Sequence, residues 1–169
     1  MTPRPWARIF GSGPIGAAAS LALLGLAAWV AGRTPALELG LPGPFRWGVA
    51  IAGALAAVAV IGWSVRALPV GDRGRRLATG GPFRWVRHPL YGAFLSLFNP
   101  ALAVALDHPA YLVWAAALHP LWHLLIRPEE RLMHRVFGPA YAAYAARTGR
   151  FFPRLSTGPG GGHRVPPSR

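Results

Sequence analysis

The chain has 169 residues, of which 53% are hydrophobic and 14% are charged, and its formal net charge is +13. This length corresponds to one domain. The chain has no cysteine, which excludes disulfide bonds and thiolate metal sites. A strongly basic chain can bind nucleic acid, but these arginines flank long uncharged runs instead of clustering with aromatic residues on one soluble face. We therefore expect no nucleic-acid partner.

Four stretches have about the length and composition of a membrane-spanning helix, which needs roughly 20 apolar residues. They contain no Asp, Glu or Arg and cover residues 10–32, 47–65, 89–106 and 109–126. The sequence therefore predicts an all-α polytopic membrane protein with about four transmembrane helices. Short cytoplasmic helices are expected after the fourth span.

The first stretch begins with GSGPIG at residues 11–16, which satisfies the G-x-G-x-x-G pattern of dinucleotide-binding proteins. That pattern requires a preceding strand and a βαβ unit, whereas here it opens a run of membrane length. We interpret these glycines as a flexible start of the first span. A cleaved signal peptide is an alternative, although its apolar region is usually only about 7–15 residues long.

The small residues and the polar residues within the spans predict different features of the helix packing. Small residues let helices approach closely, and the candidates for such contacts are Ala18, Ala22, Gly48, Ala52 and Ala56. Polar residues and prolines inside a span need partners, so they are expected to line the interior of the bundle. These residues are Asn99, Pro100, His119, Pro120 and His123.

The distribution of arginine between the spans predicts the orientation. Residues 66–87 contain six arginines and only Asp72 as an acid, whereas the turn at Asp107 and His108 contains no arginine. The positive-inside rule places the first of these segments in the cytoplasm and the turn on the other side. Both termini are then cytoplasmic, including residues 1–9, and a bacterial inner membrane is the expected location.

Residues 80–94 read GGPFRWVRHPLYGAF and lie at the cytoplasmic mouth of the third expected span. Much of this segment has a structural explanation. Pro89 suits the first turn of a helix, while Tyr91 suits the aromatic belt of a membrane interface and Arg87 obeys the positive-inside rule. His88 has no such explanation, so it is a candidate functional residue.

Residues 126–155 contain Glu129 and Glu130, two of only five acidic residues in the chain. Acids in the first turn of a helix stabilise it through the helix dipole, which is the simplest explanation for the pair. Gly138 followed by Pro139 similarly predicts that one helix stops and another starts. In so acid-poor a chain, a paired carboxylate at the membrane surface can also bind a cation or accept a proton.

The two segments together carry a family resemblance. GPFRWVRHPLY, followed after two hydrophobic spans by EERLMHRVFGPAYAAYAARTGRFFPRL, resembles the C-terminal half of the integral-membrane methyltransferases. That group includes isoprenylcysteine carboxyl methyltransferase and the phospholipid N-methyltransferases. The resemblance covers residues 80–155 within a single expected domain, residues 10–155. Residues 156–169 form a basic tail that is expected to be disordered.

The resemblance implies methyl transfer from S-adenosylmethionine to a lipophilic acceptor at the cytoplasmic face of the membrane. A prenylcysteine carboxylate, a phospholipid amine, a small thiol and other lipophilic groups all stay open as acceptors. The oligomeric state also stays open. Membrane lipid and a lipophilic small molecule are the expected partners.

The resemblance also assigns site residues. The implied cofactor-binding residues are Arg87, His88, Pro89, Tyr91, Glu129, Glu130, Tyr141 and Tyr144. Glu129, Glu130 and Arg127 are the candidates for the chemistry itself. One carboxylate is expected to hold the cationic part of the cofactor, or to order Arg127 or Arg131 around the cofactor's carboxylate, and the other to accept a proton from the methyl acceptor. Which carboxylate has which role stays open. Phe83 replaces the usual Tyr of the family, and Gly92 directly follows Tyr91.

His119 and His123 support a rival interpretation. They lie four residues apart on one helical face and can ligate a metal or supply one axial ligand of a haem. Both axial ligands of one haem cannot come from the same face of one helix. A redox or metal-binding membrane protein and a non-catalytic membrane protein are therefore the alternatives, and no metal site is assigned.

Overall fold

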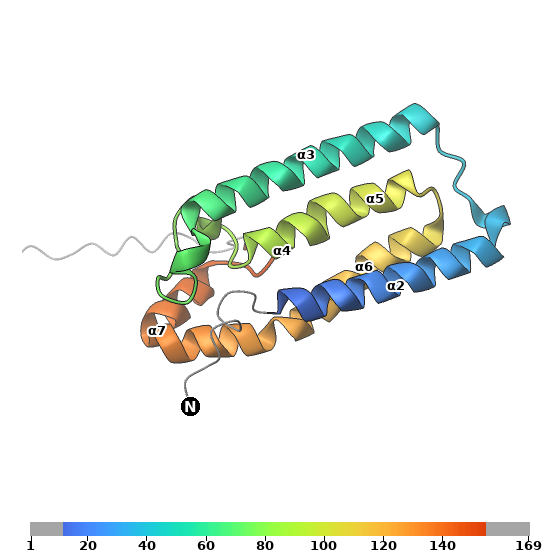
Figure 1. Ribbon diagram of the computed structural model, residues 1–169. Coiled ribbons are helices and arrows are strands. Elements are labelled where there is room, and N and C mark those ends of the chain that lie inside the picture. Colours follow the sequence, from blue (N-terminus) through green and yellow to red (C-terminus); the bar gives the residue numbers. More distant parts are fainter. Residues whose placement is uncertain (1–11, 155–169) are drawn as a thin grey trace, which may run out of the picture.

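The computed structural model describes residues 12–154, which form helices joined by short loops (Figure 1). The elements in chain order are α2 (Gly13–Arg33), η1 (Pro35–Leu37), α3 (Gly43–Ala67), η2 (Val70–Asp72), η3 (Gly81–Arg84), α4 (Pro89–Ala93), the π-helical η4 (Phe94–Phe98), α5 (Asn99–Ala105), α6 (Pro109–Leu125) and α7 (Arg127–Arg147). Within this described part of the chain there is no strand beyond a single bridge between Val86 and Gly149. The predicted all-α class is confirmed.

Each of the four expected spans coincides with a helix. Among the described residues, three helical segments are long and apolar enough to cross a membrane: α2, α3 and residues 109–147, whose apolar part is α6. The third expected span is the shorter apolar helix Pro89–Ala105, formed by α4, η4 and α5. Residues 1–9 and the tail 156–169 lie outside the described residues.

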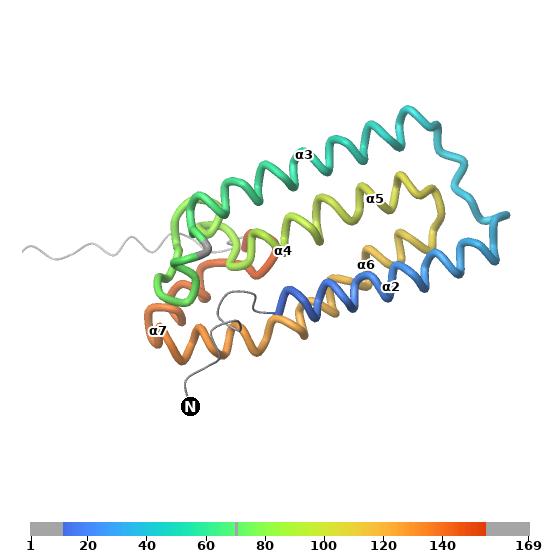
Figure 2. Tube along the Cα trace, in the orientation of Figure 1, coloured from blue at the N-terminus to red at the C-terminus, as the bar shows by residue number. Residues whose placement is uncertain are grey.

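The long helices lie side by side in an order that differs from their order in the chain. α3 packs against α5, α5 packs against α6, and α6 packs against α2. As a result α2 and α3, which follow each other in sequence, occupy opposite edges of the layer (Figure 2). All the helix ends that carry the candidate site residues therefore meet at one end of the bundle, next to α7 (Figure 1).

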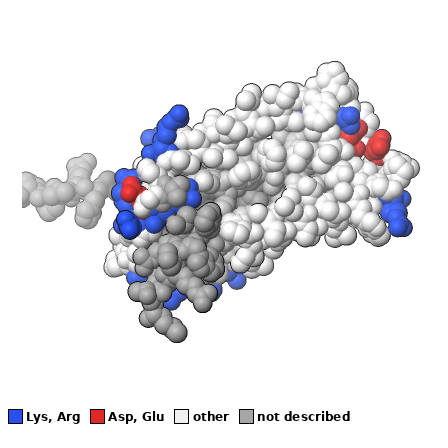
Figure 3. Space-filling view, viewed as in Figure 1, with Lys and Arg blue, Asp and Glu red and all other residues white. Residues whose placement is uncertain are grey.

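The surface of the bundle suits a lipid environment. Charged side chains gather at the two ends, and an uncharged belt separates them on the visible face (Figure 3). Large apolar side chains are exposed along the helices between these ends, for example Leu21 (66%), Leu55 (65%) and Val113 (67%). A continuous apolar surface of this extent is uncommon on a soluble monomer, so the chain is a membrane protein.

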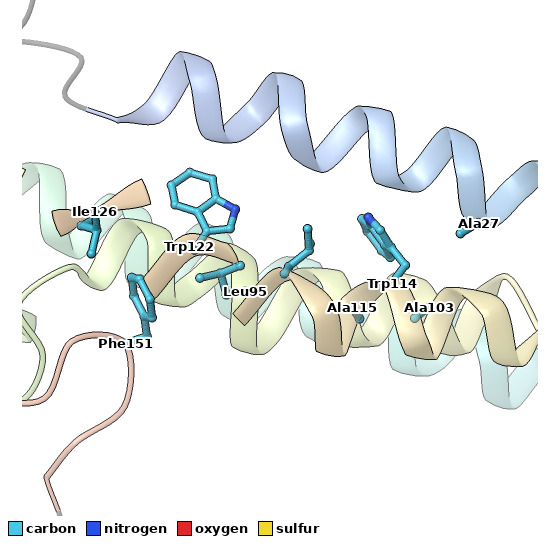
Figure 4. Packing of buried hydrophobic residues seen from close by; sticks show 9 residues of the cluster. Ala27, Leu95, Ala103, Trp114, Ala115, Trp122, Ile126 and Phe151 are labelled. Carbon is cyan, nitrogen blue, oxygen red and sulfur yellow. The ribbon is translucent and has the colours of Figure 1, made fainter. Parts of the chain in front are cut away.

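The contact between α2 and α6 depends on Gly16. A Cβ atom at Gly16 would collide with the indole ring of Trp122. The same ring donates a hydrogen bond from Nε1 to Ser20 Oγ at 3.0 Å, and Trp114 Nε1 donates to the Ser20 carbonyl at 3.1 Å. Figure 4 shows both indole rings on the side of α6 that faces α2. The interpretation of residues 11–16 as a flexible start was wrong for residues 13–16, which are helical, and Gly16 among them is closely packed.

The expectation for the other small residues was also wrong. Ala18, Ala22, Gly48, Ala52 and Ala56 are all exposed. On α3 the close contact is made instead by Gly53, where a Cβ atom would collide with Ala101 and lie 2.8 Å from the Leu97 carbonyl oxygen. Small residues thus do allow close helix contacts here, but from a different face of each helix.

The third expected span contains a π-helical turn because of Pro100. Proline has no backbone N–H, and its ring clashes with the carbonyl group four residues earlier, which is that of Ser96. A wider π turn at Phe94–Phe98 removes that clash without breaking the helix. Asn99 in this region is buried, as expected for a polar residue within a span.

Gly16 gives a test of the helix packing. We expect Gly16→Ala to lower the free energy of unfolding by about 1–3 kcal/mol, because the new methyl group overpacks the contact with Trp122. Gly25→Ala is the matched control on the same helix, since a Cβ atom at Gly25 would meet no neighbouring segment within 4 Å. Thermal unfolding midpoints in detergent measure both variants. Equal midpoints would contradict the α2–α6 contact.

Candidate active site

A cavity of about 390 Å³ lies at the end of the bundle beside α7. Its size falls within the range of small-molecule sites, about 300–1,000 Å³. Four segments form its wall: the first turn of α2, the loop between α3 and α4, the start of α4, and α7. The lining residues are Gly13, Pro14, Ala17, Leu68, Arg73, Gly74, Leu77, Ala78, Phe83, Arg87, His88, Pro89, Leu90, Tyr91, Glu129, Leu132, Met133, Val136, Tyr141 and Tyr144.

The backbone before α4 is held by the segment that follows α7. Arg87 N–H donates to the Gly149 carbonyl at 2.8 Å, and His88 N–H donates to the Arg150 carbonyl at 3.1 Å. A Cβ atom on Gly92 would lie 3.0 Å from the Phe151 carbonyl oxygen. Glycine directly after Tyr91 therefore lets the C-terminal segment approach the start of α4, which carries the candidate residues His88 and Tyr91.

Glu130 is the centre of an ion-pair cluster. Arg87 Nε donates to Oε1 at 2.9 Å, Arg150 donates to Oε2 from Nε at 2.8 Å and from Nη2 at 2.6 Å, and His88 Nε2 lies 3.5 Å from Oε1. The residue is buried, with 8% of its surface exposed. Burial by itself raises the pKa of this carboxyl, but His88, Arg150 and Arg87 outweigh it and hold the pKa well below its usual range.

Arg87 extends this cluster to the far half of α7. Its Nη1 donates to the Ala145 carbonyl at 3.0 Å and to the Thr148 carbonyl. Tyr144 adds a bond from the same half of α7, because its hydroxyl donates to the Phe83 carbonyl at 2.6 Å. These bonds attach both halves of α7 to the segment before α4, so the cavity has a defined shape.

Glu129 has a different environment from its neighbour. Its carboxylate lines the cavity and accepts a hydrogen bond from the Ser12 N–H at 3.3 Å and from the Tyr91 hydroxyl at 3.5 Å. His88 Nδ1 lies 3.8 Å away. No arginine of residues 12–154 lies within 4.0 Å of it. Glu129 therefore presents a negative charge to the cavity, whereas the charge of Glu130 is neutralised.

Four aromatic side chains also line the cavity, namely Phe83, Tyr91, Tyr141 and Tyr144. Tyr91 stacks on His88 with ring centroids 5.9 Å apart and contacts the Trp122 ring at 4.7 Å. Burial raises the pKa of Tyr144 to about 12 and also raises the pKa of Tyr141. The buried Tyr141 hydroxyl has no hydrogen-bond partner within residues 12–154. A ligand in the cavity can supply that partner.

The structure brings most of the predicted site residues to this cavity. The predicted residues in the lining are Arg87, His88, Pro89, Tyr91, Glu129, Tyr141 and Tyr144. Glu130 and Arg127 are absent from the lining and border a separate groove with Arg131. Gly138 has a φ of 52° and breaks α7 into two helices, which confirms the predicted stop and start.

Sequence reasoning missed part of the wall. Arg73 lines the cavity from the loop between α3 and α4, but nothing in the sequence distinguishes it from the other arginines nearby. Leu132, Met133 and Val136 share a face of α7 with Glu129, and their spacing of three, four and seven residues from Glu129 was a usable signal. Arg150 was also missed, although it belongs to the segment that carries the resemblance.

His119 and His123 lie outside the cavity lining. His123 Nδ1 is 3.3 Å from Arg150 Nη1, and the His119 ring stacks on Phe152 with centroids 5.2 Å apart. Among the described residues, no group of three or more His, Asp or Glu side chains is placed to hold a metal ion.

Comparison with known proteins gives the family. The family model for phospholipid methyltransferases matches residues 47–140, more than half of the chain. The chain belongs to the phospholipid methyltransferase family. The matched region includes the segment before α4 and both glutamates, which confirms the resemblance seen in the sequence. Part of the candidate site of this phospholipid methyltransferase family member lies outside the matched region. The first turn of α2, Tyr141 and Tyr144 line the cavity, and Arg150 binds Glu130.

Two curated relatives carry names that refer to metal resistance. The chain is 41% identical over 88 residues to the cobalt-zinc-cadmium resistance protein CzcN of Cupriavidus metallidurans, covering 51% of this chain and 39% of that protein. It is 39% identical over 88 residues to the nickel-cobalt-cadmium resistance protein NccN of Alcaligenes xylosoxydans xylosoxydans, covering 51% of this chain and 40% of that protein. The similarity thus spans about two fifths of the length of each relative.

The contrast between the two glutamates predicts different effects on stability. Glu130→Gln leaves Arg87 and Arg150 without their counter-charge, so we expect it to lower the free energy of unfolding by about 3 kcal/mol, as for other broken buried ion pairs. Glu129→Gln removes a first-turn helix charge but keeps a side-chain oxygen that can accept from Ser12 and Tyr91, so it should cost less than about 1 kcal/mol. Denaturant unfolding in detergent measures both. A larger loss for Glu129→Gln would contradict this assignment.

Proposed function

We propose that the chain transfers a methyl group from S-adenosylmethionine to a lipophilic acceptor at the cytoplasmic face of the membrane. The observation that carries this proposal is the position of Glu129. It places an acid that pairs with no arginine of residues 12–154 in an apolar and aromatic cavity, at the arginine-rich end of a membrane bundle. Membership of the phospholipid methyltransferase family supports the same chemistry.

The residues of the cavity fit the groups of S-adenosylmethionine. This cofactor has a cationic sulfonium, an ammonium, a carboxylate and an adenine ring. Glu129 can hold a cationic group, while Arg73 and His88 are the lining residues suited to a carboxylate. The rings of Tyr91 and Phe83 offer apolar faces for adenine, and the unpartnered Tyr141 hydroxyl offers a hydrogen bond. When bound, the cofactor supplies an activated methyl group.

The chemistry requires positioning more than a reactive side chain. Methyl transfer is a one-step in-line displacement, so the protein has to align two reactants and exclude water from between them. The hydrogen bonds of Arg87 and Tyr144 hold α7 against the segment before α4, which helps to keep the cavity rigid enough to align the two reactants. No Ser or Cys nucleophile is required for such a reaction.

Glu129 is also the better candidate for a proton acceptor. A general base is most effective when its pKa lies near the working pH. The pKa of Glu130 is held well below its usual range by the ion pairs around it, which makes that carboxylate a weak base. We therefore propose that Glu130 positions the residues around it. Glu129 either binds the cationic part of the cofactor or accepts a proton from the methyl acceptor. Arg127 borders the outer groove and is assigned no step here.

The proposed orientation follows from charge. The cavity lies at the end of the bundle that carries the arginine-rich segment 66–87, and arginines gather visibly at that end (Figure 3). The positive-inside rule supports a cytoplasmic position for this end, where soluble cofactor is available. A lipophilic acceptor can reach the same end from the bilayer. A bacterial inner membrane is the proposed location.

The acceptor is proposed only as a class. The cavity wall is mainly apolar, which suits a phospholipid amine or a prenylcysteine carboxylate better than a polar metabolite. The metal-resistance names of the relatives belong to those proteins and identify no methyl acceptor.

Calorimetric titration of the detergent-purified chain with S-adenosylhomocysteine tests the cofactor assignment. We expect binding by the unmodified chain and an affinity at least about tenfold weaker in Glu129→Gln, a loss of about 1.4 kcal/mol. The loss has a simple physical reason, since Gln keeps the shape of the side chain and removes the charge that holds the cationic end. A labelled-methyl assay over lipid extracts then measures turnover on the acceptor.

Glu38→Gln is the matched control, because it makes the same chemical change at an exposed position in the loop at the far end of the bundle. It should bind the cofactor normally. If the unmodified chain fails to bind, the proposed cofactor is wrong. If both Gln variants bind as well as the unmodified chain, Glu129 has no part in the site.

A further inference from the structure

A second groove, of about 300 Å³, lies beyond Glu130 and outside the cavity. Its lining residues are Arg127, Glu130, Arg131, His134 and Arg150. We propose that this groove binds the phosphate headgroup of an anionic phospholipid. The proposal goes beyond methyl transfer and does not depend on it, because Glu129 and the other polar residues proposed to hold the cofactor lie in the separate cavity.

The acidic residues of the chain leave an excess of positive charge in the groove. All five acidic side chains of the chain lie within the described residues, so each can be placed. Asp72 pairs with Arg76, Asp107 pairs with Arg46, and Glu130 pairs with Arg87 and Arg150. Glu38 lies in the loop between α2 and α3, and Glu129 faces the cavity.

Arg127 and Arg131 are therefore left without a carboxylate partner. Neither makes an ion pair within 4.0 Å to any Asp or Glu side chain of the chain. The single acid in the groove, Glu130, is already shared between two other arginines. Three guanidinium groups thus border one space with a net positive charge, and guanidinium groups bind phosphate oxygens with strong charge-assisted hydrogen bonds.

The position of the groove favours a lipid over free phosphate. α6, an apolar membrane segment, ends at Leu125, and α7 begins at Arg127. Leu124 precedes Arg127 by three residues and has 53% of its surface exposed. Arg131 follows one turn later, so an exposed apolar side chain and two arginines succeed each other along one side of the helix. A phospholipid has matching groups in the same order, because its apolar acyl chains are followed by a charged phosphate.

The groove and the cavity are separated by the ion-pair cluster. Arg150 borders the groove and binds Glu130, while Arg87 binds the same carboxylate from the cavity side. A headgroup in the groove would therefore be a bound lipid distinct from a methyl acceptor in the cavity.

Native mass spectrometry of the full chain in detergent tests the proposal. Phosphatidylglycerol and phosphatidylcholine with identical acyl chains are the two probes. We expect the chain to bind phosphatidylglycerol more tightly, and the double variant Arg127→Gln with Arg131→Gln to weaken that binding at least about tenfold, given roughly a fivefold contribution from each basic residue at a membrane surface. Binding of phosphatidylcholine should change less than about twofold.

The matched control is the double variant Arg135→Gln with Arg147→Gln, which removes two exposed arginines from the same helix outside the groove. It should bind phosphatidylglycerol within about twofold of the unmodified chain. Equal losses in the two double variants would show only a general attraction of anionic lipid and would overturn the proposal. Each single Gln variant, with an expected loss of about fivefold, keeps the test decisive if the double variant does not fold.

Competition by inorganic phosphate separates the two sources of a phosphate group. We expect millimolar phosphate to leave bound phosphatidylglycerol largely in place, because it offers no acyl chain to the surface beside Leu124. Complete displacement by micromolar phosphate would identify the groove as a site for the free anion and would overturn the lipid assignment.

Discussion

The carboxylate of Glu130, held between Arg87 and Arg150, is the interaction on which the site depends. It joins three segments that are far apart in the sequence: the turn before α4, the first turn of α7, and the chain after α7. A buried charge is tolerated only when its partners compensate for lost hydration. The two arginines do so here, and as a consequence the segments that border the cavity are fixed relative to one another.

This arrangement separates two adjacent carboxylates by environment. Glu129 and Glu130 are neighbours in the chain and both belong to the first turn of α7, yet one lines the cavity and the other is neutralised behind its wall. Successive residues on a helix point about 100° apart, which is enough to place them on opposite sides of a thin wall. A pair of acids can therefore serve one site in two ways, with one residue giving rigidity and the other giving charge.

The spans and most of the polar and aromatic residues of the candidate cavity were predictable from the sequence, because apolar length and the family resemblance are strong signals. The packing faces of α2 and α3 were not. Both helices are apolar all round, so the residue pattern does not reveal that Gly16 and Gly53 face neighbours while Ala18 and Ala52 do not. The position of Arg73 in the cavity wall was also unpredictable. Only the conformation of its loop places Arg73 in the lining while Arg75 and Arg76 lie outside it.

A crystal structure of the chain with bound S-adenosylhomocysteine would test the proposed cofactor site most directly. We expect ligand density in the cavity beside Glu129 and His88, with the Glu130 ion pairs to Arg87 and Arg150 still formed. S-adenosylhomocysteine bound in the groove beside Arg127 instead of the cavity, or a cavity filled by lipid alone at saturating ligand, would contradict the proposed site.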